Sequence, residues 1–189
     1  VSVWFEPTDI HKAAKPLQSN IWKTIDFVSP NFNELRVMCN AAELGTYGTV
    51  DANDLPDEDV IRESKELAVS LGEHVRTVIA TLGHRGIVLC RRGDADEPFF
   101  EVSGGNRAKR LPHQIAKPLE ARYYPAPLCR PVSVSGAGDC WNAGFISAAL
   151  LGKSEKDCVE AGFNAALCSL AATSAVPSDL KTRQTKLRN

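Results

Sequence analysis

The sequence lacks long hydrophobic runs, an excess of charge of one sign and any recognisable leader. Its longest apolar stretch, residues 143–151, is interrupted by Ser147 and falls far short of the ~20 residues that span a bilayer. The first residues do not show the pattern of a signal peptide, which is a charged start followed by an apolar segment. The 22 Lys and Arg nearly balance the 23 Asp and Glu, for a net charge of −1, whereas dedicated nucleic-acid binders carry a basic excess. We therefore expect a cytoplasmic protein without membrane or nucleic-acid partners.

The sequence also lacks the spacing patterns of disulfide frameworks and zinc sites. Its cysteines are scattered without a C-x-x-C pair, at positions 39, 90, 129, 140, 158 and 168. The four histidines stand far apart and match no zinc spacing. Reduced thiols are the better interpretation, and structural zinc is not expected. Methionine is almost absent: the chain begins at Val1 and its single methionine is Met38. The chain is therefore expected to be either processed or a piece of a longer protein.

What is present is an alternation of strand-like and helix-like segments. Strands are predicted at 1–5, 25–28, 75–82, 87–90 and 131–135, with one or two more in the proline-rich stretch 99–131. Helices are predicted at 11–19, 31–44, from about 56 to 71, 137–151 and 155–173. Asn31 followed by Glu34 suggests a capping box, and the glycine-bounded turn 83–86 suggests a hairpin-like pair. Such alternation predicts a layered α/β domain with a mostly parallel sheet.

The most informative segment is the glycine turn that follows the strand predicted at 131–135. Gly136 and Gly138 interrupt a strand-like run just where a helix begins, and unpaired first-turn amides with the positive end of the helix dipole favour a phosphate group. Asp139 in this turn has two interpretations. It is either a helix-terminal acid that suits the dipole, or the base that takes a proton from a hydroxyl attacking the phosphate.

Two other glycine motifs fail their tests. A dinucleotide fingerprint G-x-G-x-x-G would need a third glycine at position 141, where Trp141 stands, so a NAD-dependent oxidoreductase is a weak match. The segment 152–154 imitates the end of a P-loop, but the first glycine position holds Ser147 and the segment follows a helix. A plain turn between two helices is the better interpretation of 152–154.

The segment 135–145, SGAGDCWNAGF, resembles the C-terminal signature of the ribokinase-like (PfkB) carbohydrate kinases. The resemblance implies Asp139 as catalytic base and an anion hole formed by Gly136, Ala137 and Gly138. Three further segments, 29–34, 81–86 and 161–166, resemble family elements in the same order. They imply nucleotide-binding residues Asn31, Glu34, Thr81, Gly83, Gly86 and Asn164, with Glu34 organising magnesium through water.

The resemblance implies a ribokinase-like Rossmann-type three-layer α/β sandwich over 1–177, as the nucleotide-binding and catalytic C-terminal portion of a kinase domain. Nothing in the chain matches the family's N-terminal lid portion, and 178–189 is expected to be a loose basic tail. Ser133 stands where the family usually has an acid of a monovalent-cation site. Potassium dependence is therefore open, with Ser133, Ser135 and Ser174 as weak candidate ligands.

The sequence thus predicts ATP- and Mg²⁺-dependent phosphoryl transfer to a hydroxyl of a sugar or nucleoside. Segments 4–9 and 133–135 look most like the pseudouridine kinase branch, which favours pseudouridine. The alternative is a catalytically incomplete fragment that only binds nucleotide or a partner, because the sugar-gripping portion is missing. In this family a lid can mediate pairing, so a homodimer is compatible with the resemblance. A cut through a kinase domain also predicts exposed strand edges near Val1–Phe5 and self-association.

Overall fold

The computed structural model describes residues 1–103 and 107–172, so Ser174 and the tail 178–189 lie outside the described residues. The chain forms two compact units. Unit 1 comprises Val1–Gly93 and Pro112–Ala126, and unit 2 comprises Asp94–Leu111 and the chain from Pro127 onward. Neither unit is a single stretch of sequence.

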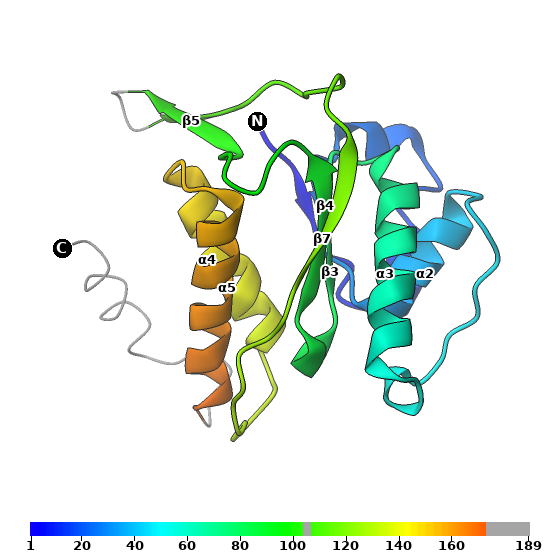
Figure 1. Ribbon diagram of the computed structural model, residues 1–189. Coiled ribbons are helices and arrows are strands. Elements are labelled where there is room, and N and C mark those ends of the chain that lie inside the picture. The colour runs from blue at the N-terminus through cyan, green and yellow to red at the C-terminus, as the bar shows by residue number, and fades with distance from the viewer. Residues whose placement is uncertain (104–106, 173–189) are drawn as a thin grey trace. The chain divides into compact units, whose positions relative to one another are not determined.

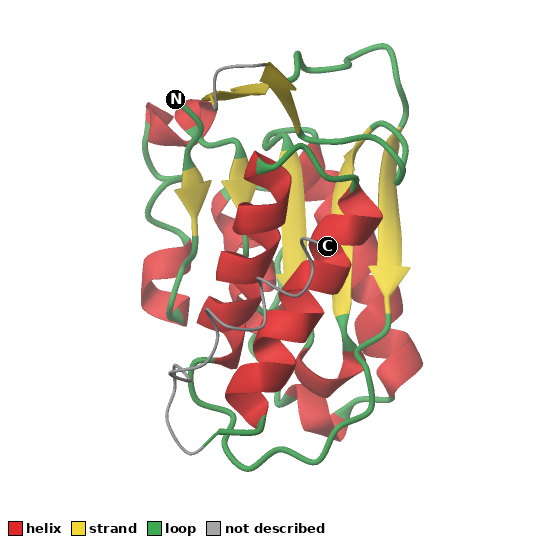
Figure 2. Ribbon diagram, turned by 90° about the vertical axis from the view of Figure 1, so that its left-hand side faces the viewer, coloured by secondary structure: helices red, strands yellow, loops and turns green. Residues whose placement is uncertain are grey.

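Unit 1 is built on a five-stranded sheet in the order β1-β2-β3-β4-β7, whose strands lie side by side (Figure 2). The strands are β1 Trp4–Phe5, β2 Phe27–Val28, β3 Thr77–Thr81, β4 Ile87–Arg92 and β7 Leu119–Tyr124. β1, β2 and β3 pair in parallel. β4 is antiparallel to β3, because the short turn 82–86 between them folds the chain straight back, and it is also antiparallel to β7. The hairpin-like pair predicted from the sequence is thereby confirmed.

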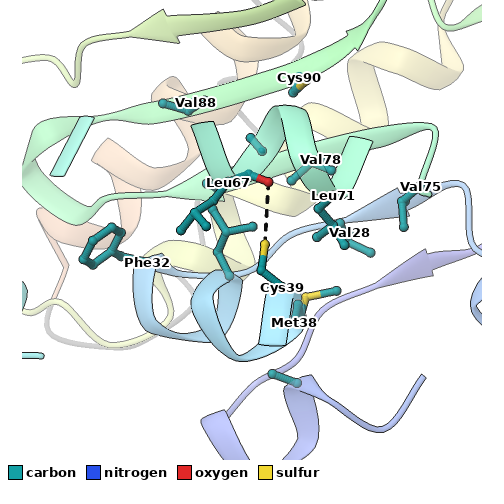
Figure 3. Packing of buried hydrophobic residues seen from close by; sticks show 14 of the residues in the cluster. Val28, Phe32, Met38, Cys39, Leu67, Leu71, Val75, Val78, Val88 and Cys90 are labelled. Atoms are coloured by element: carbon teal, nitrogen blue, oxygen red, sulfur yellow. Dashed lines mark hydrogen bonds between the residues drawn. The ribbon is translucent and has the colours of Figure 1, made fainter. Parts of the chain in front are cut away.

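The helices of unit 1 are α1 Ile10–Ala13, α2 Phe32–Ala41 and α3 Asp57–Gly72, with short 3-10 turns at Asn20–Thr24, Ala52–Asp54 and Gly83–Arg85. α2 and α3 lie side by side along the sheet (Figure 1). Their apolar faces meet β2, β3 and β4 in one core, where Leu35, Leu67 and Val78 are at most 2% exposed. Figure 3 shows this packing, with the Cys39 thiol donating to the Leu67 carbonyl at 3.6 Å. Each such side chain contributes roughly 1.5–3 kcal/mol by leaving water, which fixes α2 on the sheet.

Unit 2 contains the antiparallel hairpin β5 Phe100–Ser103 and β6 Arg107–Arg110, and two helices, α4 Ala137–Leu150 and α5 Glu155–Leu170. The two helices are connected by a turn in which Gly152 has φ +71°, and they lie side by side (Figure 1). Both were predicted from the sequence nearly to the residue. Among the described residues, no helix is long and apolar enough to cross a membrane, and the six cysteines are free thiols.

The described part of the stretch 99–131 holds three strands, β5, β6 and β7, rather than the one or two predicted. One predicted strand and one predicted helix also differ from the structure. The strand predicted at 131–135 is wrong: this segment is irregular, with Val132 64% and Val134 73% exposed. Its apolar alternation satisfies a strand pattern, but the amides of Val132 and Ser133 both donate to the carbonyl of Leu170, the last residue of α5. The helix predicted at 11–19 is shorter, because α1 ends at Ala13 and the chain continues in turns.

Candidate functional site

The start of α2 carries the capping box that the sequence predicted. The Asn31 side chain accepts the Glu34 amide at 2.9 Å, and Glu34 Oε2 accepts the Asn31 amide at 2.7 Å. Glu34 is only 4% exposed. Burial raises the pKa of its carboxyl above the usual value of 4.5, the Asn31 amide opposes this shift, and the charges of Glu6 and Asp9 add to it. A buried carboxylate close to two other acids is electrostatically suited to a nearby cation.

The end of β3 lies directly beside this helix start. Asn31 and Thr81 form a parallel bridge, and the Thr81 amide donates to the Pro30 carbonyl at 2.8 Å. Thr81 is half-buried and Asn31 is exposed. Two sequence segments that were predicted to bind nucleotide, separated by about fifty positions, are thus neighbours at the carboxyl ends of β2 and β3. In open α/β sheets, ligands bind at this end of the strands.

The turn after β3 has an open side and a closed side. Gly83 has φ +62°, and a Cβ placed on it would meet nothing within 4 Å. Gly86 has φ +108°, and its Cβ would lie 2.1 Å from the Tyr124 carbonyl oxygen and 2.6 Å from the Ala126 nitrogen. The turn is closed by the Leu82 amide, which donates to the Gly86 carbonyl at 2.8 Å. Gly83 therefore leaves bare backbone accessible, whereas Gly86 allows the chain to pass close to the end of β7.

In unit 2, α4 begins at a turn whose backbone only glycine adopts readily. Gly136 is the N-cap of α4 in the left-handed region, φ +75° and ψ +2°, and no side chain caps the helix. The amides of Gly138 and Asp139 belong to the first turn, where amides precede the first intrahelical acceptors. A Cβ on Gly138 would meet nothing within 4 Å. Asp139 is exposed, and its carboxylate makes no hydrogen bond or ion pair with the described residues. The turn thus combines accessible donors with an accessible carboxylate.

The segment leading into this turn is held from α5. The buried Ser169 hydroxyl donates to the Ser135 carbonyl at 3.2 Å, and the Ser135 amide donates to Ser133 Oγ at 3.3 Å. These contacts occupy one oxygen each of Ser133 and Ser135, two of the three predicted monovalent-cation candidates. Among the described residues, no group of three or more His, Cys, Asp or Glu side chains could hold a metal ion.

α4 and α5 pack closely against each other around Trp141. Trp141 is 3% exposed, and its ring lies where a Cβ on Gly162 would come within 2.7 Å. It also stacks on Phe145, with ring centroids 5.1 Å apart. Trp141 therefore serves the packing of α4 against α5. Asn164, two residues beyond Gly162, is exposed on α5 and its amide is not used in packing.

The structure thus brings Asn31, Glu34 and Thr81 together in unit 1, with Gly83 and Gly86 in the following turn. In unit 2 it gathers Gly136, Ala137, Gly138 and Asp139 in one helix start. One candidate residue was missed: Arg85, which lies inside the predicted nucleotide turn and is 8% exposed. Only its unusual burial, invisible in the sequence, distinguishes it from an ordinary surface arginine.

Comparison with known proteins agrees with these features. Residues 115–183 match the model of the pfkB family of carbohydrate kinases. The pseudouridine kinase of Arabidopsis thaliana is 29% identical over 96% of this chain and 53% of its own length. The chain thus spans about half the length of this curated relative.

Solved structures of sugar and nucleoside kinases share the fold. The ribokinase from Cryptococcus neoformans in complex with ADP superimposes with a TM-score of 0.69 and 19% identity, covering 100% of this chain and 52% of that one. The adenosine kinase from Schistosoma mansoni in complex with 2-fluoroadenosine gives a TM-score of 0.62 and 14% identity, over 96% of this chain and 45% of that one. The chain therefore has the α/β ribokinase-type fold, and its residues 115–183, which include the turn at Asp139, match the model of the pfkB family of carbohydrate kinases.

Proposed function

We propose that this chain carries the ATP-binding and phosphoryl-transfer residues of a carbohydrate or nucleoside kinase. The observation that carries the proposal is the glycine turn of α4, where first-turn amides and the exposed Asp139 lie together within the segment that matches the kinase family. Amides at a helix start bind a transferring phosphoryl group, and a carboxylate beside it accepts the proton of the attacking hydroxyl. Both functions come from one short stretch of backbone.

In this proposal the residues divide the work as follows. Asp139 takes the proton of the acceptor hydroxyl, while the amides of Ala137, Gly138 and Asp139 bind the transferring group. Asn31, Thr81, Gly83, Gly86 and Asn164 bind the nucleotide. Mg²⁺ neutralises phosphate charge when bound, and Glu34 would hold it through water. Glu34 fits this indirect role because one of its oxygens caps α2 and because no cluster of protein ligands is present in the described chain.

Pseudouridine is the favoured acceptor, supported by the resemblance to the Arabidopsis pseudouridine kinase over 96% of this chain. A panel of pseudouridine, uridine, adenosine and ribose, each with Mg-ATP, would rank the acceptors by initial rate. A higher rate with uridine, adenosine or ribose than with pseudouridine would contradict the preference.

The role of Asp139 is tested by Asp139→Asn. A general base contributes on the order of 10²–10⁴-fold, so turnover should fall by that factor while ATP affinity stays close to wild type. The matched control is Asp157→Asn. Asp157 occupies the same third helical position in α5 that Asp139 occupies in α4, and both are exposed. Equal turnover of the two variants would remove Asp139 from the role of base.

A second candidate is a chain that binds nucleotide without catalysis. It is favoured by the span of this chain, about half of its curated relative, because catalysis depends on positioning and exclusion of water. Titration with Mg-ATP followed by each nucleoside discriminates the two. Phosphorylated product made by this chain refutes the binding-only function, and nucleotide binding without product supports it.

A further inference from the structure

An extended strap connects the two nucleotide segments of unit 1. This strap, residues 47–52, runs beside α2 and is tied to it by two side-chain amides that act like peptide groups. Asn33 donates to the Val50 carbonyl at 2.8 Å and accepts the Val50 amide at 3.1 Å. Asn40 donates to the Tyr47 carbonyl and accepts the Tyr47 amide, both at 2.7 Å. The side-chain amide of each asparagine thereby makes the two hydrogen bonds, one donated and one accepted, that a backbone residue makes in a β-bridge.

Arg36 completes the attachment of the strap to α2. Its guanidinium donates to the Gly48 carbonyl at 2.9 Å and forms two bonds of 2.7 Å to Glu63 on α3. The guanidinium also lies 4.6 Å from the centre of the Phe32 ring. α2, whose start is capped by Asn31 and Glu34, therefore holds one side of the strap along its length.

Arg85 holds the other end of the strap to the nucleotide turn. Its Nε donates to Asp57 Oδ1 at 2.6 Å, and its Nη2 donates to the Ala52 carbonyl at 3.0 Å. Its side chain is only 6% exposed, although Asp57 is a surface residue in the first turn of α3. The carbonyl of Arg85 itself accepts the Tyr123 hydroxyl at 2.6 Å. The turn 82–86 is thus fixed from three elements at the residue before Gly86.

We propose that Arg85 is a positioning residue, which holds the Thr81–Gly86 turn in its nucleotide-binding geometry through Asp57 and the Ala52 carbonyl. This inference rests on the proposed ATP binding. Through the strap, the same arginine fixes the turn relative to the helix start at Asn31 and Glu34. The open backbone at Gly83 has no side chain to fix its own position, so its geometry depends on this anchor two residues away.

The test compares Arg85→Met with a matched variant at the other end of β4. Arg92 has the same kind of contacts: one ion pair, to Glu73 just beyond α3, at 2.8 Å, and one backbone bond, to the Lys117 carbonyl, at 3.0 Å. Arg92→Met therefore removes equivalent contacts far along the strand from the turn. Affinity for Mg-ATP is measured by calorimetry on the whole chain. Misplacement of a positioned group can cost about 10²-fold in reaction rate; for Mg-ATP affinity we expect a smaller loss, on the order of 10-fold, in Arg85→Met and no change in Arg92→Met.

Two further measurements separate positioning from general stability. Arg85→Lys keeps the charge facing Asp57 and should recover part of the lost affinity, and Asp57→Asn should weaken ATP binding without adding to the effect of Arg85→Met. Amide hydrogen exchange at Gly83–Gly86 should accelerate in Arg85→Met and not in Arg92→Met, with or without nucleotide.

Each outcome decides a different point. Wild-type chain that binds no Mg-ATP overturns the proposed function and the nucleotide part of this inference. Wild-type binding with equal affinity in Arg85→Met overturns the positioning role alone. Equal exchange rates in the two arginine variants show that Arg85 does not hold the turn, and this also overturns the inference.

Discussion

Two glycines of the turn 82–86, the proposed nucleotide turn, have positive φ angles for different reasons. At Gly83 the backbone alone requires glycine, since a Cβ would enter open space. At Gly86 the required conformation coincides with backbone contact to the end of β7. These backbone atoms cannot move without displacing the strand. The two positions therefore separate the cost of conformation from the cost of collision.

We expect Gly86→Ala to lower the free energy of unfolding by about 3 kcal/mol, from strain and overpacking together. Gly83→Ala should cost only about 1–2 kcal/mol, from the left-handed conformation. Urea unfolding of both variants measures the difference. Equal losses would show that the chain near Tyr124 gives way to an added methyl group.

Glu34 makes stability depend on pH in a direction opposite to that of most surface acids. Its pKa is raised in the folded state, so the folded state takes up the proton first as pH falls. Protonation of Glu34 therefore adds stability below the folded pKa, and this contribution is lost as pH rises through that value. Glu34→Gln keeps an oxygen that can accept the Asn31 amide but has no charge to bury.

The wild type should accordingly gain stability relative to Glu34→Gln as pH is lowered from 7 into the range just above the usual glutamate value of 4.5. Urea unfolding at matched pH values gives this difference, in which other titrating groups cancel. A difference that stays constant with pH would show that burial does not disfavour the Glu34 carboxylate.

At the scale of elements, α4 and α5 approach closely because glycines replace side chains at their contacts. A Cβ on Gly144 would lie 2.5 Å from the Ala161 carbonyl oxygen, and one on Gly162 would lie 2.7 Å from the Trp141 ring. Trp141 is two residues after Asp139, and Gly162 is two residues before Asn164. The packing of this helix pair therefore sets the spacing between the proposed base Asp139 and the proposed nucleotide-binding amide of Asn164.

Gly162→Ala should separate the helices at Trp141 and cost about 1–3 kcal/mol, measured by urea unfolding. Gly138→Ala provides the contrast, because its Cβ would meet nothing within 4 Å and alanine favours a helix over glycine by about 0.5–1 kcal/mol. Its stability should be equal to or greater than that of the wild type, whereas nucleotide binding should weaken as the methyl group enters the proposed phosphoryl site. A stable Gly162→Ala would contradict this account of the helix contact.

The elements were predictable where the signal is local. Capping by Asn31 and Glu34 and the positions of α4 and α5 follow from caps, glycines and apolar spacing. The segment 131–135 was not predictable, because whether an apolar alternation becomes a strand depends on a partner strand, which the sequence does not specify. For the site, motif residues such as Thr81 and Asp139 could be named from the sequence. The strap and Arg85 could not, because their bonds join segments whose proximity follows only from the fold.

At the scale of the whole molecule, β1 and β7 are the edges of the unit 1 sheet. β1 is two residues long, and next to it Val1 and Val3 are exposed. Unpaired strand edges with apolar side chains promote pairing between molecules, and lysine at an edge suppresses it. We expect concentration-dependent self-association, as the sequence also predicted.

Sedimentation velocity of Val3→Lys should show less association than wild type. The control is Val69→Lys on α3, because Val69 and Val3 are equally exposed at 37%. Equal association of the two variants, or a wild type that remains monomeric over the whole concentration range, would exclude the β1 edge as the contact.

The distribution of tryptophans gives the molecule an optical reporter of its own. Trp4 stacks on Phe27 and Trp22 lies against His74, both in unit 1. Trp141 is the tryptophan of unit 2, where it is buried in α4 two residues after the proposed base Asp139. Replacing Trp4 and Trp22 by phenylalanine leaves one indole, whose emission then reports events at the glycine turn without an added dye. Nucleotide binding and the unfolding of unit 2 can each be followed by the fluorescence of Trp141, separately from the unfolding of unit 1.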